Sequence, residues 1–416
     1  MEVSRRSRSV KGSSTLAVTA KAKELARGGV RVLSFAAGEP DFDTPEVVKR
    51  AAIEALGRGH TKYVPTAGDP ETRAVIADKL TRENGLSGVS ADHVVVTAGA
   101  KHALYLAFQA LVDPPAHGAE APEVLLPVPA WVSYDPIARL CGGRVVELET
   151  TAAGGFKVTP RQLERALTPR ARVLILNSPN NPCGTMYTPE ELRGLAGVVA
   201  SAARSICPGL VIVTDEIYEK IVYGPCPHFS IGSVPEVAER TITINGLSKA
   251  FAMTGWRVGY LAGSGEFGRR VAQAAEKLQG QMTTSIVSFV FPAIRAALTE
   301  CAGEVEQMRG AFARRARLIA ERLERVPGLV CPRPTGAFYL FPDVSAYLGR
   351  TTGGGRRVAT AAEMAGALLE EEHVAVVPGE DFGGPGWRHI RLSFACSEET
   401  IDEGMERVVR FFARLR

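Results

Sequence analysis

The chain has 416 residues, of which 45% are hydrophobic and 23% are charged, as is typical of a globular protein large enough for more than one core. The 49 basic and 45 acidic residues leave a net charge of only +4, which gives no electrostatic basis for binding nucleic acid or an anionic membrane. No apolar run has the length of a membrane span, and the arginine-rich start SRRSRSVKGSS lacks the apolar centre of a secretion signal, so we expect a cytoplasmic protein.

Helices and strands alternate over residues 44 to 260. The segment TPEVVKRAAIEALGRG, residues 44–59, has the end signals of a helix, with Thr44 as the expected N-cap and Pro45 in the first turn. HVVVTAG, residues 93–99, is a short β-branched run that leads into a second helix. Further short apolar strands follow: EVLLPV, GRVVELE, ARVLILN, GLVIVTD and RTITING. Nearly continuous apolar strands are typical of a parallel sheet that helices cover on both faces.

The pattern changes after about residue 290. Before that point, Thr188 and Glu191 form the capping box of another predicted helix between two of the strands. After it, a long basic helical stretch precedes hairpin-like segments such as TGAFYLF and HIRLSFA. We therefore predict an α/β fold: a large domain at 44–290 with a mostly parallel sheet covered by helices, a smaller α+β domain at 291–416, and an arm at 1–43 that includes part of the small domain.

Polar residues fall where the predicted strands end. Asp215 ends GLVIVTD and is followed by Tyr218, Asn181 follows ARVLILN, Trp131 follows EVLLPV, and Lys249 follows RTITING. The turn TAGAKHA opens a helix whose free backbone N–H groups suit a phosphate. Because ligands bind at the carboxyl ends of strands in open α/β sheets, we expect these residues to share one site.

Lys249 stands among small and apolar residues in NGLSKAFAMTGWRVGY, with no acid in the segment to pair with it. A lysine in such a setting usually loses its proton or forms a covalent bond, and both outcomes are chemistry. Pyridoxal phosphate needs a lysine amine, a carboxylate for its ring nitrogen, donors for its phenolic oxygen, a flat side chain against its ring and an anion cradle. The strand ends supply all of these groups, so the sequence predicts pyridoxal 5'-phosphate as the cofactor.

The segment GLSKAFAMTGWRVG resembles the class I aminotransferase signature around the cofactor lysine. AAGEPDFDTP, KYVPTAGDPETR, PAWVSY, NSPNNPCG, VTDEIYE, TGAFYLF, VVPGEDF and IRLSFA appear in the order of that family, and the resemblance covers nearly the whole chain. The sequence most resembles the bacterial aspartate aminotransferase branch of the fold type I pyridoxal phosphate enzymes. This resemblance implies ping-pong transfer of an amino group from an L-amino acid, aspartate first, to a 2-oxo acid such as 2-oxoglutarate.

The resemblance also implies a role for each matched residue. Lys249 is expected to form the Schiff base and to move the proton of the substrate Cα, and Asp215 to hold the pyridine nitrogen. Arg391 is expected to bind the substrate α-carboxylate with its planar fork, against the backbone of Gly38. The other implied cofactor contacts are Tyr218 and Asn181 at the phenolic oxygen, Trp131 on the ring, and Ala100, Lys101, Ser248 and Arg257 at the phosphate. Trp131 and Asn181 are also expected to touch the substrate.

Two further roles involve a second subunit. Tyr63 in KYVPTAG is expected to reach the cofactor phosphate of a partner, which implies a homodimer with shared active sites. Thr15 and Lys101 are expected at the side-chain carboxylate of the substrate, with the lysine supplied by the partner.

The sequence departs from the family pattern at several positions. Gly246 stands where many relatives have a phosphate-binding serine, Cys183 replaces the usual threonine, and Ala130 precedes Trp131 in place of an aromatic residue. Ile286 and Val287 replace a polar residue and a proline. The last change could bear on substrate choice.

The sequence also allows interpretations other than a pyridoxal phosphate enzyme. Taken singly, each matched residue could be a cap, a core side chain or a surface ion pair. Gly263, Gly265 and Gly268 spell the GxGxxG fingerprint of dinucleotide-binding enzymes, but no acid follows at the distance that a ribose requires. A regulator with a degraded aminotransferase body would carry a DNA-binding domain, and too few residues precede AAGEP to hold one. Within the aminotransferases, the amino counterpart of prephenate, aromatic amino acids and alanine stay open as donors.

The seven cysteines and seven histidines are scattered along the chain. The cysteines form no CxxC pair, and the histidines show no metal-ligand spacing. The sequence therefore predicts neither a disulfide framework nor a metal site.

Overall fold

A seven-stranded sheet organises the larger part of the molecule in this computed structural model, which describes residues 2–10, 12, 14–116 and 118–416. The strand order is β2-β8-β7-β6-β5-β3-β4, and β8 runs antiparallel to both of its neighbours while the other pairs are parallel. The strands are β2 (Val94–Thr97), β3 (Glu123–Val128), β4 (Arg144–Glu149), β5 (Ala171–Asn177), β6 (Val211–Asp215), β7 (Thr241–Gly246) and β8 (Gly259–Gly263). The predicted α/β class with a mostly parallel sheet is confirmed.

Helices cover both faces of this sheet because successive strand residues point to opposite sides. In β3, Val124 and Leu126 pack against α5 and α6, while Leu125 between them packs against α7 and α8 on the other face. The helices around the sheet are α3 (Glu46–Gly57), α4 (Pro70–Asn84), α5 (Ala100–Leu111), α6 (Tyr134–Leu140), α7 (Pro160–Ala166), α8 (Pro189–Ala203), α9 (Pro235–Ala238), α10 (Gly265–Gly280) and α11 (Phe291–Glu300).

Two predicted helix starts have different outcomes. The Thr188 capping box is present, with the Thr188 backbone donating to Glu191 at 2.8 Å and the Glu191 backbone donating to Thr188 Oγ1 at 3.3 Å. The prediction that Thr44 caps α3 is wrong, because Pro45 holds the N-cap position. The Thr44 hydroxyl instead donates to the Ala252 carbonyl at 2.7 Å, so it ties the start of α3 to the loop that carries Lys249.

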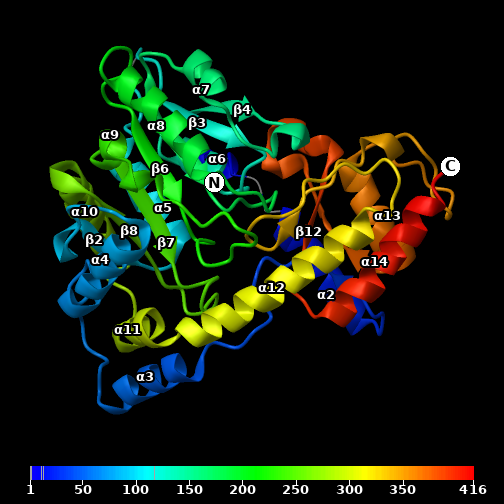
Figure 1. The fold of residues 1–416 in the computed structure, drawn as a ribbon, viewed down its shortest axis with the longest axis horizontal. Coiled ribbons are helices and arrows are strands. Elements are labelled where there is room, and N and C mark those ends of the chain that lie inside the picture. Colours follow the sequence, from blue (N-terminus) through cyan, green and yellow to red (C-terminus); the bar gives the residue numbers. More distant parts are fainter. Residues whose placement is uncertain (1, 11, 13, 117) are drawn as a thin grey trace.

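The C-terminal part of the chain builds a second core of helices and short strands. Figure 1 shows the long helix α12 (Ala302–Leu323) running from the side of α11 towards β12 and α14. The other elements here are β9 (Tyr339–Leu340), α13 (Ala361–Glu372), β10 (Val374–Ala375), β11 (Val377–Pro378), β12 (Ile390–Ser393) and α14 (Glu398–Ala413). They bury Phe312, Phe338 and Phe412 in a hydrophobic cluster that also includes Ile217 and Tyr218 from the segment after β6.

The N-terminal arm packs on this second core rather than on the large sheet. It contains α1 (Arg5–Arg8), α2 (Ser14–Arg27) and β1 (Leu33–Ser34). Strand β1 pairs in parallel with β10, and α2 packs near β10 and β11. This pairing joins residues 33 and 34 to the C-terminal elements, as the predicted arm at 1–43 requires, while the domain boundaries themselves stay a prediction.

Among the described residues, we find no helix that is both long enough and apolar enough to cross a membrane.

Candidate functional site

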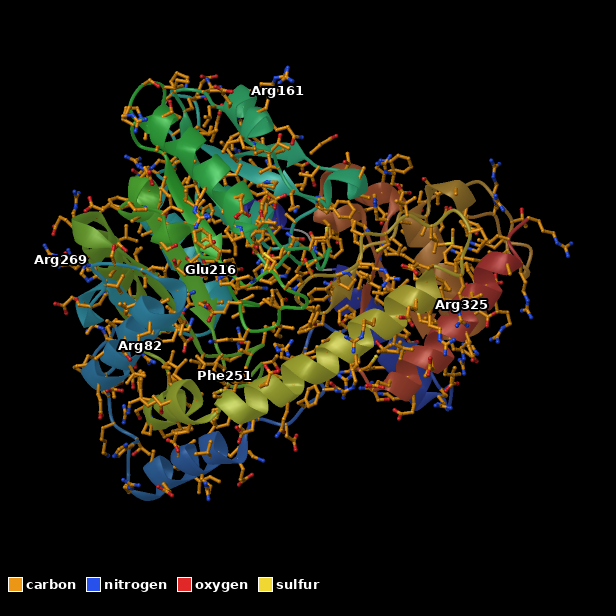
Figure 2. The ribbon with its side chains drawn as sticks, in the orientation of Figure 1. Arg82, Arg161, Glu216, Phe251, Arg269 and Arg325 are labelled. Atoms are coloured by element: carbon orange, nitrogen blue, oxygen red, sulfur yellow. The ribbon has the colours of Figure 1, made fainter. Side chains whose placement is uncertain are left out.

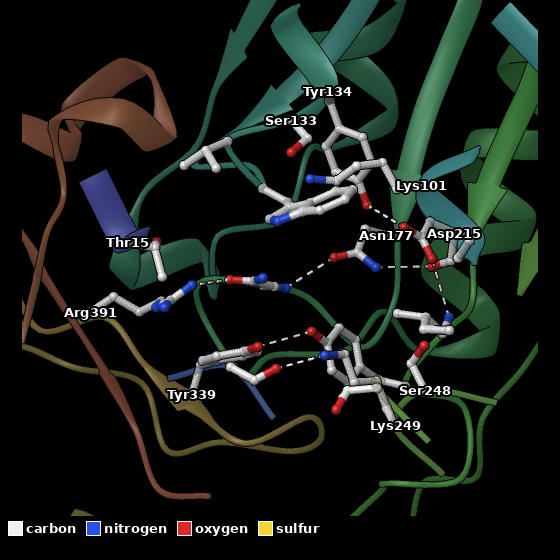
Figure 3. Close-up of a pocket in the computed structure, with 18 of the residues that line it drawn as sticks. Thr15, Lys101, Ser133, Tyr134, Asn177, Asp215, Ser248, Lys249, Tyr339 and Arg391 are labelled. Atoms are coloured by element: carbon white, nitrogen blue, oxygen red, sulfur yellow. Dashed lines mark hydrogen bonds between the residues drawn. The ribbon is translucent and has the colours of Figure 1, made fainter. Parts of the chain in front are cut away.

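A pocket of about 400 Å³ opens where the large sheet meets the C-terminal core (Figure 3). It lies at the carboxyl ends of the parallel strands, which is where ligands bind in open α/β sheets. The pocket brings together almost every predicted site residue: Thr15, Gly38, Ala100, Lys101, Trp131, Asn181, Asp215, Tyr218, Ser248, Lys249, Arg257 and Arg391. Of the predicted residues, only Tyr63 does not line the part of the pocket that the structure describes.

Lys249 lies in the turn after β7 and points into the pocket. Its Nζ donates a hydrogen bond of 2.6 Å to the carbonyl oxygen of Gly38, which takes the place of the missing acid in its own segment. Burial is the main cause that lowers the pKa of Lys249 to about 8; nearby Glu39 opposes this shift, while the Arg257 and Arg391 guanidinium groups add to it. The amine is therefore neutral in a useful fraction of molecules near neutral pH, as a nucleophile or base must be.

The loop around Lys249 has an unusual backbone. Ala252 and Arg257 adopt φ values of 50° and 56°, which residues other than glycine rarely do. Strain of this kind persists where the surroundings hold it, and it gathers at functional sites. Here the Thr44 bond to Ala252 and the 2.9 Å bond from Arg257 Nη1 to the Thr254 carbonyl hold the loop in shape.

Asp215, the last residue of β6, is the buried carboxylate of the pocket. Its Oδ2 accepts a 2.7 Å hydrogen bond from the Tyr134 hydroxyl, and its Oδ1 accepts one of 3.2 Å from the Ile217 backbone. Burial raises the pKa of Asp215 to about 6, although both hydrogen bonds favour the ionised form. A cation placed against this carboxylate would keep it ionised.

Sequence reasoning missed two residues that position the predicted ones. Tyr134, at the start of α6, holds Asp215 through its hydroxyl group. The Asn177 side chain donates to the Asp215 carbonyl at 2.9 Å and accepts from the Asn181 backbone at 2.9 Å, so it links the ends of β5 and β6. The position of Asn177 at the end of ARVLILN was a usable signal, since the other strand ends were read in that way.

Tyr218 and Tyr339 form a hydroxyl pair on the opposite wall. Their oxygens are 3.0 Å apart, and burial raises the pKa of Tyr218 well above its ordinary value, so both rings stay protonated as possible donors. A side chain at Gly38 would come within 2.6 Å of the Tyr339 hydroxyl. Gly38 thus leaves room for the Tyr339 hydroxyl, while its contact with a substrate carboxylate stays a prediction. Tyr339, within TGAFYLF, is a pocket residue that the sequence did not lead us to expect.

Arg391 is fully enclosed and directed by its neighbours. Its Nη1 donates to Asn181 Oδ1 at 3.2 Å and its Nη2 donates to the Ala36 carbonyl at 2.8 Å. The guanidinium carbon lies 4.8 Å from the ring centre of Tyr339 and 5.3 Å from that of Phe382, between two aromatic faces. Burial lowers the pKa of Arg391, and its Nε is buried without a hydrogen-bond partner among the described residues, so the guanidinium group suits an anionic ligand.

The start of α5 has the groups that an anion would need. The first N–H groups of a helix have no partner within it, and here Ala100 and Lys101 line the pocket at that end. Arg257 reaches the same place, where a side chain at Gly99 would collide with its guanidinium group. Ser248 adds a hydroxyl group at the pocket wall. The arrangement suits a phosphate, as was predicted from TAGAKHA.

The far end of the pocket contains Thr15, Trp131 and Lys101. The Lys101 Nζ lies 4.9 Å from the centre of the Trp131 ring, and Figure 3 labels the lysine in the pocket. The lysine of the same chain lines this pocket, which corrects the expectation that Lys101 reaches it from a partner. Burial, together with Arg257, lowers the pKa of Lys101. A bound anion would therefore offset the free-energy cost of keeping this ammonium group charged.

The sequence departures lie outside the pocket. A side chain at Gly246 would come within 2.7 Å of the Val258 carbonyl, so the strand pairing leaves no room for a serine at this position. Cys183 is fully buried, and burial raises the pKa of its thiol well above the ordinary value. Ile286 is buried whereas Val287 is 53% exposed, so Val287 faces outward from the chain.

The glycines of the GxGxxG run serve local packing. Gly263 and Gly268 stand backbone against backbone where β8 turns into α10, and neither lines the pocket. This run is therefore a turn into a helix, as predicted.

Comparison with known proteins gives an independent view of the chain. The pattern of the family described as aminotransferase class I and II matches residues 30–408. The chain is 43% identical to an aspartate aminotransferase of Geobacillus stearothermophilus and 44% identical to an aspartate/prephenate aminotransferase of Thermus thermophilus, in each case over 99% of both chains.

Solved structures agree with the sequence comparison. An aspartate aminotransferase of Thermus thermophilus with maleate matches 99% of both chains at 43% identity with a TM-score of 0.88. An aspartate aminotransferase of Rhizobium meliloti matches all of both chains at 38% identity with a TM-score of 0.91.

Proposed function

Because the chain belongs to the class I and II aminotransferases, we propose that its pocket binds pyridoxal phosphate at Lys249 and moves an amino group from an L-amino acid to a 2-oxo acid. The observation that carries this proposal is the placement of a lysine of lowered pKa and a buried carboxylate in one cavity, at the ends of the neighbouring strands β7 and β6. Arg391, with its unpartnered Nε, supplies the site for a substrate carboxylate in the same cavity.

The chemistry of these residues fits the cofactor. The start of α5, Ser248 and Arg257 offer donors to a phosphate, and the indole of Trp131 offers a flat face to a ring. The Asn181 amide keeps its N–H donors for a phenolic oxygen, since its oxygen already accepts from Arg391. The Tyr218 hydroxyl can donate to the same oxygen when Tyr339 is the donor of the hydroxyl pair.

When bound, pyridoxal phosphate supplies an aldehyde that condenses with amines and a protonated ring that withdraws electrons. Asp215 holds the proton on the ring nitrogen, because opposite charges in a buried site keep each other ionised. Lys249 Nζ would take the proton from the substrate Cα as a general base and would return it as a general acid. Arg391 fixes the α-carboxylate so that the Cα–H bond faces this amine.

We assign aspartate as the preferred donor and 2-oxoglutarate as the acceptor. Lys101 and Thr15 lie at the end of the pocket where a second carboxylate of the substrate would reach. A lysine is a compact charge on a flexible stem and can meet that carboxylate without the fixed fork of Arg391. A prephenate-type 2-oxo acid is a second candidate acceptor, which the name of the Thermus thermophilus relative supports.

Replacing Lys101 by alanine tests this assignment. A charge-assisted contact contributes roughly 1.5–3 kcal/mol, so kcat/KM for aspartate is expected to fall about ten- to a hundredfold. Because alanine and phenylalanine lack a second carboxylate, their kcat/KM should change far less. The measurement is initial rates for all three donors with 2-oxoglutarate; equal losses would mean that Lys101 serves the phosphate or the fold.

The working unit is proposed to be a homodimer with shared active sites. Tyr63 is 93% exposed, and it follows α3, on which Ile53 and Leu56 are also exposed. Ser288 binds the His60 carbonyl at 2.6 Å, which brings exposed Val287 to the same region. Exposed apolar residues gathered in one region are typical of an interface between protein chains.

Hybrid dimers test the exchange of Tyr63. Mixing inactive Lys249→Ala chains with Tyr63→Ala chains under dissociating and reassociating conditions should give hybrids in which one site has both residues. Activity above that of either variant alone is expected, up to about half of the wild-type value per hybrid. Lys101→Ala is the matched control in place of Tyr63→Ala, because Lys101 lies in the pocket of its own chain and should give no such gain for aspartate. A fully active monomer by light scattering would contradict the proposal.

A further inference from the structure

A buried charged network lies behind the pocket, on the far side of the turn that follows β6. We name it the anchor network and define it as Lys79, Asn84, Glu216, Glu219 and His228. The side chains of Lys79, Glu216 and Glu219 are only 3%, 1% and 7% exposed. Glu216 is therefore buried, in contrast to the exposed Arg82 of α4, and both residues are labelled in Figure 2. Charges this deeply buried are retained only when they are paired.

Asn84, the last residue of α4, is the node of the anchor network. Its Oδ1 accepts from Lys79 Nζ at 2.7 Å, and its Nδ2 donates to Glu216 Oε2 at 2.9 Å and to Glu219 Oε2 at 2.6 Å. Lys79 also forms a buried ion pair with Glu219. One amide thus joins a cation on α4 to two carboxylates of the turn.

Glu216 and Lys79 have further partners around Asn84. Glu216 accepts from Ser230 Oγ at 2.7 Å and lies 3.2 Å from His228 Nε2. At the rim, Glu83 is 3.8 Å from the Lys79 amine and 2.6 Å from that of Lys220.

The turn itself alternates between the anchor network and the pocket. Asp215 and Tyr218 line the pocket, whereas Glu216 and Glu219 bind Asn84 on the opposite side. The segment that presents both the carboxylate and the phenol is therefore fixed from behind by α4, a helix that contributes no residue of its own to the described pocket.

The same residues resemble a cation site only in part. Ligand atoms of Glu216, Glu219 and His228 lie within 4.8 Å of one another. The Lys79 ammonium group already pairs with Glu219, so no metal ion is needed to balance the charge of this carboxylate.

We propose that Asn84 is a positioning residue for the cofactor site and that it acts through Glu216 and Glu219 on Asp215 and Tyr218. The inference rests on the proposed binding of pyridoxal phosphate. Site groups must be held within about 0.5 Å of their working geometry by the residues behind them. A loosened turn would weaken the Asp215 contact with the ring nitrogen and the Tyr218 contact with the phenolic oxygen. Both contacts favour the unprotonated form of the lysine–cofactor linkage, so their loss should raise the pH midpoint of its visible absorbance.

The test compares Asn84→Ala with the wild-type holoenzyme. We expect the pH midpoint of the visible cofactor band to rise by about 0.5 to 1 unit in the variant. The Kd for the cofactor is expected to rise roughly tenfold, because loss of the Asn84 hydrogen bonds weakens the contacts of Asp215 and Tyr218 with the cofactor. Arg82→Ala is the matched control, since it removes an exposed ion pair with Asp78 from the same helix and should leave both values unchanged.

A purely structural role would give a different result. If Asn84→Ala lowers the melting temperature of the apoprotein but leaves the band midpoint and cofactor affinity at wild-type values, the proposal is overturned. If Asn84→Ala does not fold, the same measurement is made on Glu219→Gln, which keeps the shape of the side chain. The pH midpoint of the band should rise in this variant too, and an unchanged midpoint overturns the proposal. A wild-type chain that forms no visible band with pyridoxal phosphate would instead refute the proposed function.

Discussion

Replacing Asp215 by alanine is expected to slow half-transamination with aspartate by several orders of magnitude, on the order of 10³-fold or more. The reason is electrostatic: without the carboxylate, the ring nitrogen of the cofactor loses the partner that keeps it protonated, and the ring withdraws electrons poorly. The cofactor should also bind more weakly. Stopped-flow absorbance of the holoenzyme mixed with aspartate measures the rate of this half-reaction.

Two further variants separate charge from shape at this position. Asp215→Asn keeps the volume but removes the charge, so it should lose nearly as much activity as the alanine variant. Tyr134→Phe removes only the 2.7 Å hydrogen bond to Asp215, which favours the ionised carboxylate, so a loss of about tenfold is expected. Turnover near the wild-type rate in Asp215→Ala would show that another group holds the ring nitrogen.

Replacing Lys249 by alanine should produce the largest loss, on the order of 10⁴-fold or more, because a nucleophile and a general base disappear together. Burial lowers the pKa of this lysine to about 8, so more of the amine is neutral near neutral pH than for an ordinary lysine. The measurement is the single-turnover rate with aspartate in chains loaded with pyridoxal phosphate.

Lys277→Ala is the control for this experiment. Lys277 is an exposed lysine of α10 outside the pocket, and its removal should leave the rate unchanged. A Lys249→Ala variant that retains more than about one tenth of the wild-type rate would contradict the role of Lys249.

The strand ends explain why so much of the site could be predicted from the sequence. Lys249, Asp215 and Asn181 each follow a short apolar run, and parallel strands bring their carboxyl ends to one edge. Residues far apart in the sequence therefore meet because of the sheet order. The resemblance to a family then selected Arg391 and Gly38, which no local pattern marks.

Residues that position other site residues were harder to predict from strand ends and family resemblance. Tyr134 and Asn177 line the pocket and orient Asp215 and Asn181. The strand end marked only Asn177, whereas Tyr134 at the start of a short helix has no sequence signature of its own. Thr44 had every sign of a helix cap, but a tertiary bond to the Ala252 carbonyl used its hydroxyl group instead. Local propensity was overridden by a contact between segments distant in the sequence.

The turn after β6 shows a further limit of prediction from the sequence. In VTDEIYE, the alternation of Asp215 and Tyr218 with Glu216 and Glu219 is visible in the sequence, but the two acids gave no reason to expect burial. Their pairing with Asn84 depends on where α4 ends in space. Buried charged networks are set by tertiary packing, so only the structure reveals them.

The most direct test of the account is to locate the lysine that binds the cofactor. The chain is loaded with pyridoxal phosphate, reduced with borohydride, digested and mapped by mass spectrometry. The account predicts that the reduced cofactor is attached to Lys249, within the peptide that includes GLSKAFAMTGWR, and that Lys249→Ala chains lose this label. Attachment of the cofactor to Lys101 or to any other lysine of the wild-type chain would contradict it.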